Sequence, residues 1–291
     1  MQFKGIYTAL ITPFAKSKVD EKAFQSFVEW QIGQGVHGLV PCGTTGESPT
    51  LTHEEHNRVI DLCVEVAKGR AKVMAGTGSN STDEAIMTTL HAQKVGADAA
   101  LVVAPYYNKP TQEGLYQHFK AIHDATKLPI FIYNIPARSI VDISDDTLAR
   151  LSELPRIVGI KDATGDLARV PTLRARQKKH LQLFSGEDMT AVAFNVSGGQ
   201  GCISVSSNIA PKICAQVQEA TLAGDYAKAL KLHESLVSLH EIMFCETSPA
   251  PVKYAASLLG KCSPQLRLPL VEVSELNKKH IAKVLNNLGL I

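Results

Sequence analysis

Short apolar runs recur along the first two-thirds of the chain, separated by longer segments with helical spacing. Each run lacks the alternation of a half-exposed strand and is typical of a buried parallel strand. The runs predicted to be strands are residues 6–11, 38–41, 72–75, 99–103, 130–133, 157–160, 181–184 and 201–205.

The intervening segments have the periodicity and the start signals of amphipathic helices. Apolar residues fall on one helical face at Val59, Leu62, Cys63 and Val66, and again at Leu115, Phe119 and Ile122. Thr52-His-Glu-Glu55 and Ser81-Thr-Asp-Glu84 match capping boxes, and Ser144 precedes two acids that suit a first turn.

Eight predicted strands that alternate with helices predict a (β/α)8 TIM barrel over residues 1–224. A doubly wound open sheet is the alternative. The pattern after that point is helical only, at residues 226–245, 252–259 and 273–288. Residues 225–291 are therefore predicted to be a C-terminal helical domain packed on the catalytic barrel.

Composition excludes several classes of protein. Apolar residues make up 45%, charged residues 20%, and the net charge is +2, which does not favour a nucleic-acid binder. The six cysteines are scattered without a C-x-x-C pair, and His53 with His56 lacks further ligands, so neither disulfides nor a metal site is expected. Without a signal peptide or a long apolar span, a cytoplasmic protein is expected.

Lys161 directly follows the predicted strand 157–160. In a (β/α)8 barrel the active site lies at the carboxyl ends of the strands, so a rigid scaffold would hold this side chain partly out of water. Burial disfavours the ammonium form and leaves the free amine available to attack a carbonyl. The position indicates a Schiff-base nucleophile; a lysine that extends from the strand to solvent is the alternative.

Other polar residues follow neighbouring strands. Tyr133 ends the preceding strand, and its hydroxyl could shuttle protons during imine formation beside Lys161. Arg138 offers a planar fork suited to a carboxylate. Thr44 and Thr45, within Gly43-Thr-Thr-Gly-Glu47, either cradle a carboxylate or form a simple turn.

Together these segments resemble the signatures of the class I pyruvate-dependent aldolases and lyases, and specifically those of the dihydrodipicolinate synthase (4-hydroxy-tetrahydrodipicolinate synthase) family. The resemblance covers nearly the whole chain. The segments that carry it are Gly43-Thr-Thr-Gly-Glu47, Pro105-Tyr-Tyr-Asn-Lys-Pro-Thr111, Tyr133-Asn-Ile-Pro-Ala-Arg138 and Gly159-Ile-Lys161. One departure is Ser248, where the family often has asparagine before proline.

The resemblance implies a lyase of lysine and diaminopimelate biosynthesis that condenses pyruvate with L-aspartate 4-semialdehyde to give 4-hydroxy-tetrahydrodipicolinate, without a cofactor or metal. Lys161 would form the imine, with Tyr133, Thr44 and Tyr107 as the catalytic proton-transfer group. Tyr107 would reach across a subunit interface of a homotetramer built from two dimers. The residues implied to bind substrates are Thr45, Arg138, Ile203 and Gly186.

A regulatory site is also implied, because one set of residues resembles the allosteric L-lysine site of lysine-sensitive family members. Glu84 can pair with an ammonium, although its capping role is an alternative account. The full set is Ser48, Leu51, His53, His56, Asn80, Glu84 and Tyr106.

Two other functions remain open from the residues. Another pyruvate aldolase, such as N-acetylneuraminate lyase or a keto-deoxy sugar-acid aldolase, would share the lysine and tyrosine, but Arg138 and the Tyr106-Tyr107 pair favour a short carboxylated aldehyde. A catalytically silent barrel that acts as a binding or regulatory protein is the alternative from a different class.

Overall fold

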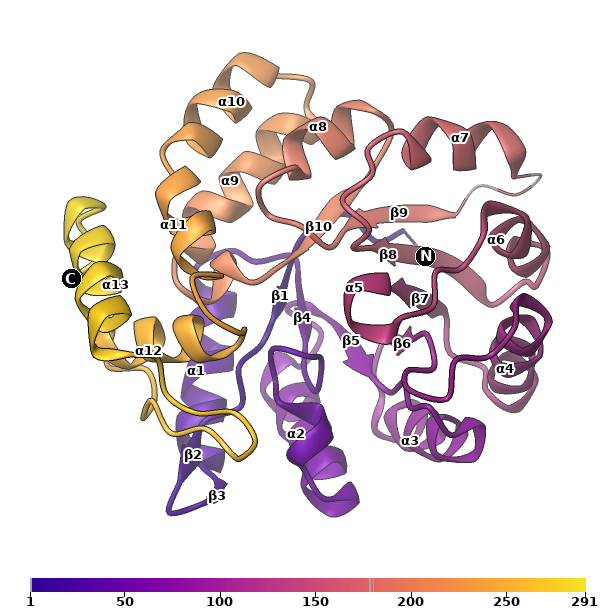
Figure 1. The fold of residues 1–291 in the computed structure, drawn as a ribbon, viewed down its shortest axis with the longest axis horizontal. Helices are drawn as coiled ribbons and strands as arrows, with labels where there is room; N and C mark the ends of the chain where they lie inside the picture. Colours follow the sequence, from indigo (N-terminus) through magenta and orange to yellow (C-terminus); the bar gives the residue numbers. More distant parts are fainter. Residues whose placement is uncertain (1, 178, 180) are drawn as a thin grey trace.

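The computed structural model describes residues 2–177, 179 and 181–291, and in this part of the chain the predicted strands close into a parallel barrel (Figure 1). The strand order around the barrel is β1-β10-β9-β8-β7-β6-β5-β4. These strands are β1 (Gly5–Ala9), β4 (Gly38–Val40), β5 (Lys72–Gly76), β6 (Ala99–Val103), β7 (Ile130–Asn134), β8 (Ile157–Asp162), β9 (Gln182–Ser185) and β10 (Gly201–Ser204). The (β/α)8 prediction is confirmed, and the open sheet is excluded.

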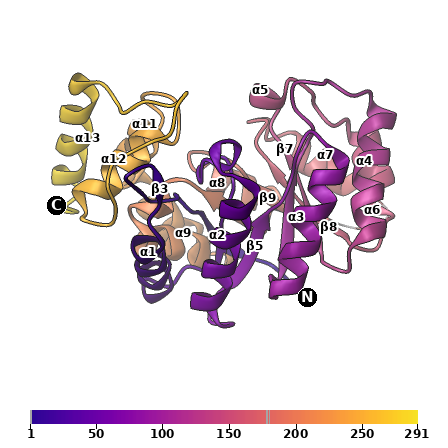
Figure 2. The same ribbon diagram turned by 90° about the horizontal axis from the view of Figure 1, so that it is seen from below.

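Helices surround the barrel, as Figures 1 and 2 show from two directions. They are α1 (Glu21–Gly33), α2 (His53–Ala67), α3 (Thr82–Val95), α4 (Gln112–Ala125), α5 (Pro136–Ser139), α6 (Asp145–Ser152), α7 (Arg169–Arg176), α8 (Ala191–Val196) and α9 (Pro211–Leu222). Two 3₁₀ turns, η1 (Ser48–Thr50) and η2 (Ser206–Asn208), follow β4 and β10. A small hairpin, β2 (Phe14–Ala15) with β3 (Lys18–Val19), was not predicted, because each of its strands is too short to have a pattern.

The C-terminal part contains α10 (Tyr226–Glu234), α11 (Val237–Ile242), α12 (Ala250–Leu258) and α13 (Glu275–Asn287). Figure 1 shows α12 and α13 beyond α1, with α10 beside α8 and α9. The single helix expected over residues 226–245 is wrong, since the chain breaks it between α10 and α11. The division into a barrel and a helical domain stays a prediction.

Two of the three predicted helix starts have the expected caps. Thr52 and Glu55 form a reciprocal capping box, and the Ser144 side chain caps α6. The box predicted at Ser81 is wrong in its second half. Ser81 accepts from the Glu84 N–H at 3.5 Å, but the Glu84 carboxylate accepts from Ser79 Oγ at 2.7 Å instead of returning to the cap.

The barrel interior is filled by side chains that alternate along the strands. Phe131 and Phe184 meet edge to face with ring centroids 5.6 Å apart, and Tyr7 meets Phe184 at 5.3 Å. Tyr133 and Ile203 belong to the same buried cluster. These rings form a rigid floor beneath the mouth of the barrel. A larger apolar layer fills the space between the barrel and its helices.

Candidate active site

Lys161 and Tyr133 are direct neighbours across β7 and β8, where the register pairs them. Both are buried, with 7% and 6% exposure, and Lys161 Nζ lies 4.1 Å from the centroid of the Tyr133 ring. The lysine was expected just beyond its strand, but β8 continues through Asp162, so Lys161 is held by the ladder itself. The β8 backbone and the Tyr133 ring, over which Nζ lies, restrict the movement of the Lys161 amine.

A cavity of about 510 Å³, including space open to solvent, lies over this pair at the barrel mouth. Thr44, Thr45, Arg138 and Gly186 line it together with Lys161. A second cavity of about 860 Å³ adjoins it and shares Thr44, Tyr133 and Arg138. The structure therefore brings these sequence-predicted residues together around one amine.

The Gly43–Glu47 loop follows β4 and lines the cavity, and contacts on the side away from the cavity fix its conformation. Thr12 Oγ1 donates to the Gly46 carbonyl at 2.7 Å. The Glu47 side chain is fully buried and accepts from Lys253 of α12 and from the Arg267 N–H. Because Glu47 is fixed on its far side, the adjacent Thr44 and Thr45 are presented to the cavity by a loop that has little freedom.

Gly186 lies where β9 ends, and its N–H donates to the Asp162 carbonyl at 2.6 Å. A Cβ at this position would meet Ala163 Cβ at 2.6 Å, so any larger residue would push against the strand that carries Lys161. Only glycine lets the backbone approach this closely.

Two acidic residues in this region were missed as site residues. Glu187 lines the cavity, and burial raises the pKa of its carboxyl, an effect that the nearby Lys161 opposes. Asp188 accepts from Ser204 Oγ at 2.5 Å and from the Val205 and Ser206 N–H groups at 2.9 and 3.0 Å. It thereby fixes the end of β10, next to Ile203. The run Ser185-Gly-Glu187 after a strand was the available signal.

The C-terminal part also contributes to the cavity, through Phe244 and Ser248. Arg138 is exposed, and its Nη2 lies 3.5 Å from the Ser248 carbonyl oxygen. The sequence could not place Phe244 here, because no local pattern connects a residue between two C-terminal helices to the mouth of the barrel.

Two expected site residues lie apart from the cavity within this single chain. The Tyr107 side chain is 92% exposed on a backbone with φ of 70°. Ile203 is fully buried, with its side chain in the barrel interior. A role for Tyr107 at the cavity therefore depends on a second copy of the chain.

The residues expected to form the lysine site lie on elements near the larger cavity. Ser48 and Tyr106 line that cavity, and His53 Nε2 is 4.0 Å from Glu84 Oε1. Asn80 accepts from Asn108 Nδ2 through its carbonyl, and Leu51 packs against the main core. Burial lowers the pKa of His56 to about 4, with His53 adding to the effect, so its ring is neutral at physiological pH.

The described residues contain no group of three or more histidine, cysteine, aspartate or glutamate side chains able to hold a metal ion. All six cysteines are free thiols. In the same ranges, none of the helices has both the length and the apolar character to cross a membrane.

The fold and the buried lysine of this site are those expected of a barrel enzyme that forms a Schiff base, and comparison with known proteins assigns the family. The profile of the Dihydrodipicolinate synthetase family matches residues 2–288. A 4-hydroxy-tetrahydrodipicolinate synthase of Rhodospirillum centenum is 59% identical over 289 residues, which are 99% of this chain and 99% of that relative.

Solved structures agree. A chloride-inhibited dihydrodipicolinate synthase from Acinetobacter baumannii complexed with pyruvate has a TM-score of 0.97 at 46% identity, covering 100% of both chains. A relative from Cyanidioschyzon merolae with lysine bound has a TM-score of 0.95 at 34% identity, covering 99% of each chain.

The chain belongs to the Dihydrodipicolinate synthetase family. It is a lyase of lysine and diaminopimelate biosynthesis, as the resemblance implied. The sugar-acid aldolase alternative is not supported, since the full-length relatives have the synthase name.

Proposed function

We propose that Lys161 is the residue through which this chain performs 4-hydroxy-tetrahydrodipicolinate synthase chemistry. The observation that carries the proposal is the buried Lys161 amine at 4.1 Å from the centroid of the Tyr133 ring, inside a cavity at the barrel mouth. The attack on a carbonyl uses the lone pair of a lysine amine, and the strand holds this amine at the wall of the cavity that a substrate would enter.

In the proposed sequence the amine adds to the C2 carbonyl of pyruvate, and water leaves to give an imine. Loss of a C3 proton gives the enamine, and this carbon attacks the aldehyde of L-aspartate 4-semialdehyde. The amine of that substrate then attacks C2, closes the ring and displaces Lys161 as the free amine. The lysine nitrogen is the electron sink for enamine formation, and the amine of the second substrate supplies the pair that closes the ring, so these steps call on neither a metal nor an organic cofactor.

Tyr133 is the proton donor and acceptor in this sequence, because its strand neighbours that of Lys161. Thr44, which lines both cavities, would relay protons between Tyr133 and Tyr107 of a second subunit. The exposure of Tyr107, 92%, suits a side chain that inserts into a partner. A homotetramer made of two dimers is the assembly that we propose.

Two different surfaces would bind the two carboxylates. Thr45 and Gly186 line the cavity in which pyruvate, which the Acinetobacter baumannii relative binds, is proposed to lie, and the backbone of Ile203 at the end of β10 would add a contact from below. Arg138, on the solvent side, would pair with the carboxylate of the aldehyde substrate through its planar fork. The exposed position of Arg138 lets the second substrate enter after the imine has formed.

We further propose feedback inhibition by L-lysine at the set that contains His53 and Glu84. The Cyanidioschyzon merolae relative has lysine bound, and Ser48 and Tyr106 line the cavity that adjoins the active site. Glu84 remains available to an ammonium because its carboxylate does not close a capping box, although it must share the contact with Ser79. A cytoplasmic location fits a biosynthetic enzyme of this kind.

The test of the nucleophile is reductive trapping. After incubation with pyruvate and borohydride, peptide mass spectrometry should find the adduct on Lys161. Lys253 is an internal comparison, because it is also buried but lies in an ion pair with Glu47. The Lys161→Met variant should remain unlabelled. An adduct on another lysine, or equal labelling of the variant, would contradict the proposal.

A further inference from the structure

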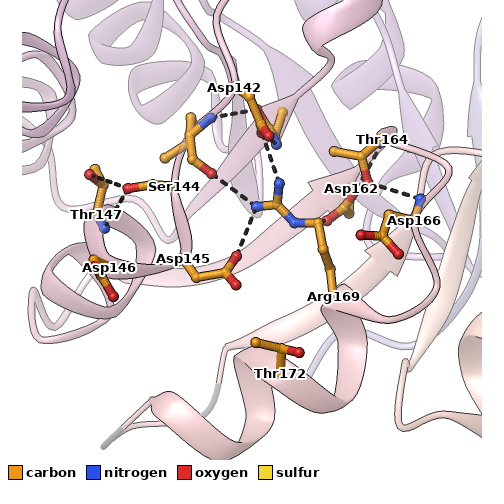
Figure 3. Close-up of polar contacts among 12 residues, drawn as sticks. Asp142, Ser144, Asp145, Asp146, Thr147, Asp162, Thr164, Asp166, Arg169 and Thr172 are labelled. Carbon is orange, nitrogen blue, oxygen red and sulfur yellow. Dashed lines mark hydrogen bonds and ion pairs between the residues drawn. The ribbon is translucent and has the colours of Figure 1, made fainter.

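Arg169, the first residue of α7, lies at the centre of an ion-pair cluster behind the active site (Figure 3). Its side chain is only 10% exposed. Nη1 donates to Asp142 Oδ1 at 2.8 Å, Nη2 donates to the Ile143 carbonyl at 2.9 Å, and Nε lies 3.3 Å from Asp162 Oδ2. Asp145 completes the cluster at 3.4 Å.

Two of these contacts lead directly to the ends of the catalytic strands. Asp162 follows Lys161 in β8. Asp142 Oδ1, which Arg169 contacts, also accepts from Nδ2 of Asn134 at 2.7 Å, and Asn134 follows Tyr133 in β7. One guanidinium thus connects the residue after the proposed nucleophile with the residue after the proposed proton donor.

The strand register makes this connection effective. Asn134 pairs with Asp162, just as Tyr133 pairs with Lys161. Because successive side chains of a strand point to opposite faces, the first pair faces the helices while the second faces the cavity. Any change in the separation of Asn134 and Asp162 is therefore passed to the inner pair through one peptide unit on each strand.

The electrostatics explain why an arginine is needed. Asp162 is buried, with 5% exposure, and burial raises the pKa of its carboxyl, while hydrogen bonds from Thr164 and the charge of Arg169 oppose this effect. Without the guanidinium a buried carboxylate would lack its cation, which is costly unless the carboxylate moves or takes up a proton. Either response would disturb the strand beside Lys161.

We propose that Arg169 is a positioning residue of the active site, which holds the ends of β7 and β8 together so that the Tyr133 hydroxyl and the Lys161 amine keep their relative placement. The inference rests on the proposed roles of Tyr133 and Lys161. It does not involve contact between Arg169 and either substrate.

The first test is Arg169→Met, compared with Arg176→Met as the matched control. Arg176 lies on the same helix, is 56% exposed and has an ion pair with Asp146 at 3.5 Å. We expect kcat of Arg169→Met to fall by about 10- to 100-fold, because a misplacement of the reacting groups by about 1 Å can cost roughly 10²-fold in rate. KM for pyruvate should change little, since Thr45 follows β4, which lies across the closed barrel from the β8 end that Arg169 contacts. Arg176→Met should retain wild-type kcat.

If Arg169 only stabilised the fold, Arg169→Met would have a lower melting temperature but would not combine a lower kcat with an unchanged pyruvate KM. Circular dichroism at the assay temperature establishes that each variant is folded. Arg169→Lys keeps the charge but loses the fork, and it should recover part of kcat. A folded Arg169→Met enzyme with wild-type kcat, or one in which only the pyruvate KM rises, overturns the inference.

A second variant, Asp142→Asn, tests the same inference if Arg169→Met does not fold. The Asp142 side chain is 53% exposed, so Asp142→Asn should be tolerated while it weakens the connection to Asn134. It should lower kcat in the same direction, and adding it to Arg169→Lys should cost less than the two single effects combined. Full activity of Asp142→Asn, or strict additivity, contradicts the shared connection.

Reductive trapping of the wild-type enzyme separates this inference from the proposed function. If pyruvate labels a residue other than Lys161, the proposed function fails first. If Lys161 is labelled at equal rates in the wild type and in folded Arg169→Met, the proposed function stands and the positioning role of Arg169 fails.

Discussion

Lys253 of α12 and Glu47 of the loop after β4 form a fully buried ion pair, with 2.5 Å between Nζ and Oε1 and no exposure of either side chain. The Lys253 ammonium also lies 3.9 Å from the centroid of the Phe14 ring. Burial lowers the pKa of Lys253, and the charge of Glu47 opposes that effect. The pair therefore attaches the C-terminal helices to the loop that presents Thr44 and Thr45.

Lys253→Met should destabilise the protein by about 3–5 kcal/mol, because it leaves a carboxylate buried without its cation. Urea unfolding followed by circular dichroism gives the change. The double variant Lys253→Met with Glu47→Gln should regain part of the stability, since no buried charge remains. Equal stability of the single variant and the wild type would mean that the pair contributes nothing to cohesion between barrel and helices.

Tyr133→Phe should lower kcat by about 10²–10⁴-fold while the fold is preserved, because only a hydroxyl that transfers protons is removed. Steady-state kinetics measure the effect. Tyr7→Phe is the matched control, since Tyr7 is buried in the same barrel interior, edge to face with Phe184. Near wild-type kcat for Tyr133→Phe would remove this residue from the mechanism.

Arg138→Ala should mainly weaken the use of L-aspartate 4-semialdehyde. A charge-assisted pair with the substrate carboxylate is worth about 1.5–3 kcal/mol, so kcat/KM for the aldehyde should fall roughly 10- to 150-fold. Arg150→Ala is the control, because that arginine is half exposed and pairs with Glu113 on the outside of the barrel. A rise in the pyruvate KM with unchanged use of the aldehyde would show the pairing to be wrong.

Millimolar L-lysine should inhibit the wild-type enzyme, and Glu84→Thr should weaken inhibition by roughly tenfold or more, because a charge-assisted contact with the ammonium is lost. Glu54→Thr is the control: Glu54 is an exposed acid in the first turn of α2, one residue after His53. Full activity of the wild type under lysine would end the proposal, and inhibition that persists in Glu84→Thr would assign lysine to another site.

Much of the barrel could be predicted from local pattern. The predicted strands at 99–103 and 38–41 differ from β6 and β4 by at most one residue, because buried parallel strands are apolar throughout and their ends are marked by turns. The hairpin of β2 and β3 escaped prediction, since two-residue strands have no periodicity. The break between α10 and α11 escaped it too, because the helical pattern continues across Ser235.

The same contrast applies to the site. Lys161, Tyr133 and Arg138 were predicted as site residues because they lie at or after the carboxyl ends of predicted strands, and parallel strands of a barrel end at one mouth. The sequence showed Glu187 as an acidic residue after a predicted strand, but no other residue in the pattern indicated a role for it in the site. Phe244 could not be predicted, since its distance from the cavity depends on how the C-terminal helices pack.

The sequence by itself determined the order of the barrel strands and the helices between them, the class of barrel and the strand ends at which the candidate site lies, because short-range periodicity and caps encode these features. Only the tertiary structure decided which distant residues meet: Lys253 with Glu47, 206 positions apart, and Arg169 with Asp142 and Asp162. The physical reason is that such pairs form after the barrel has closed, when burial removes water from charges and makes each one depend on a partner that no local pattern specifies.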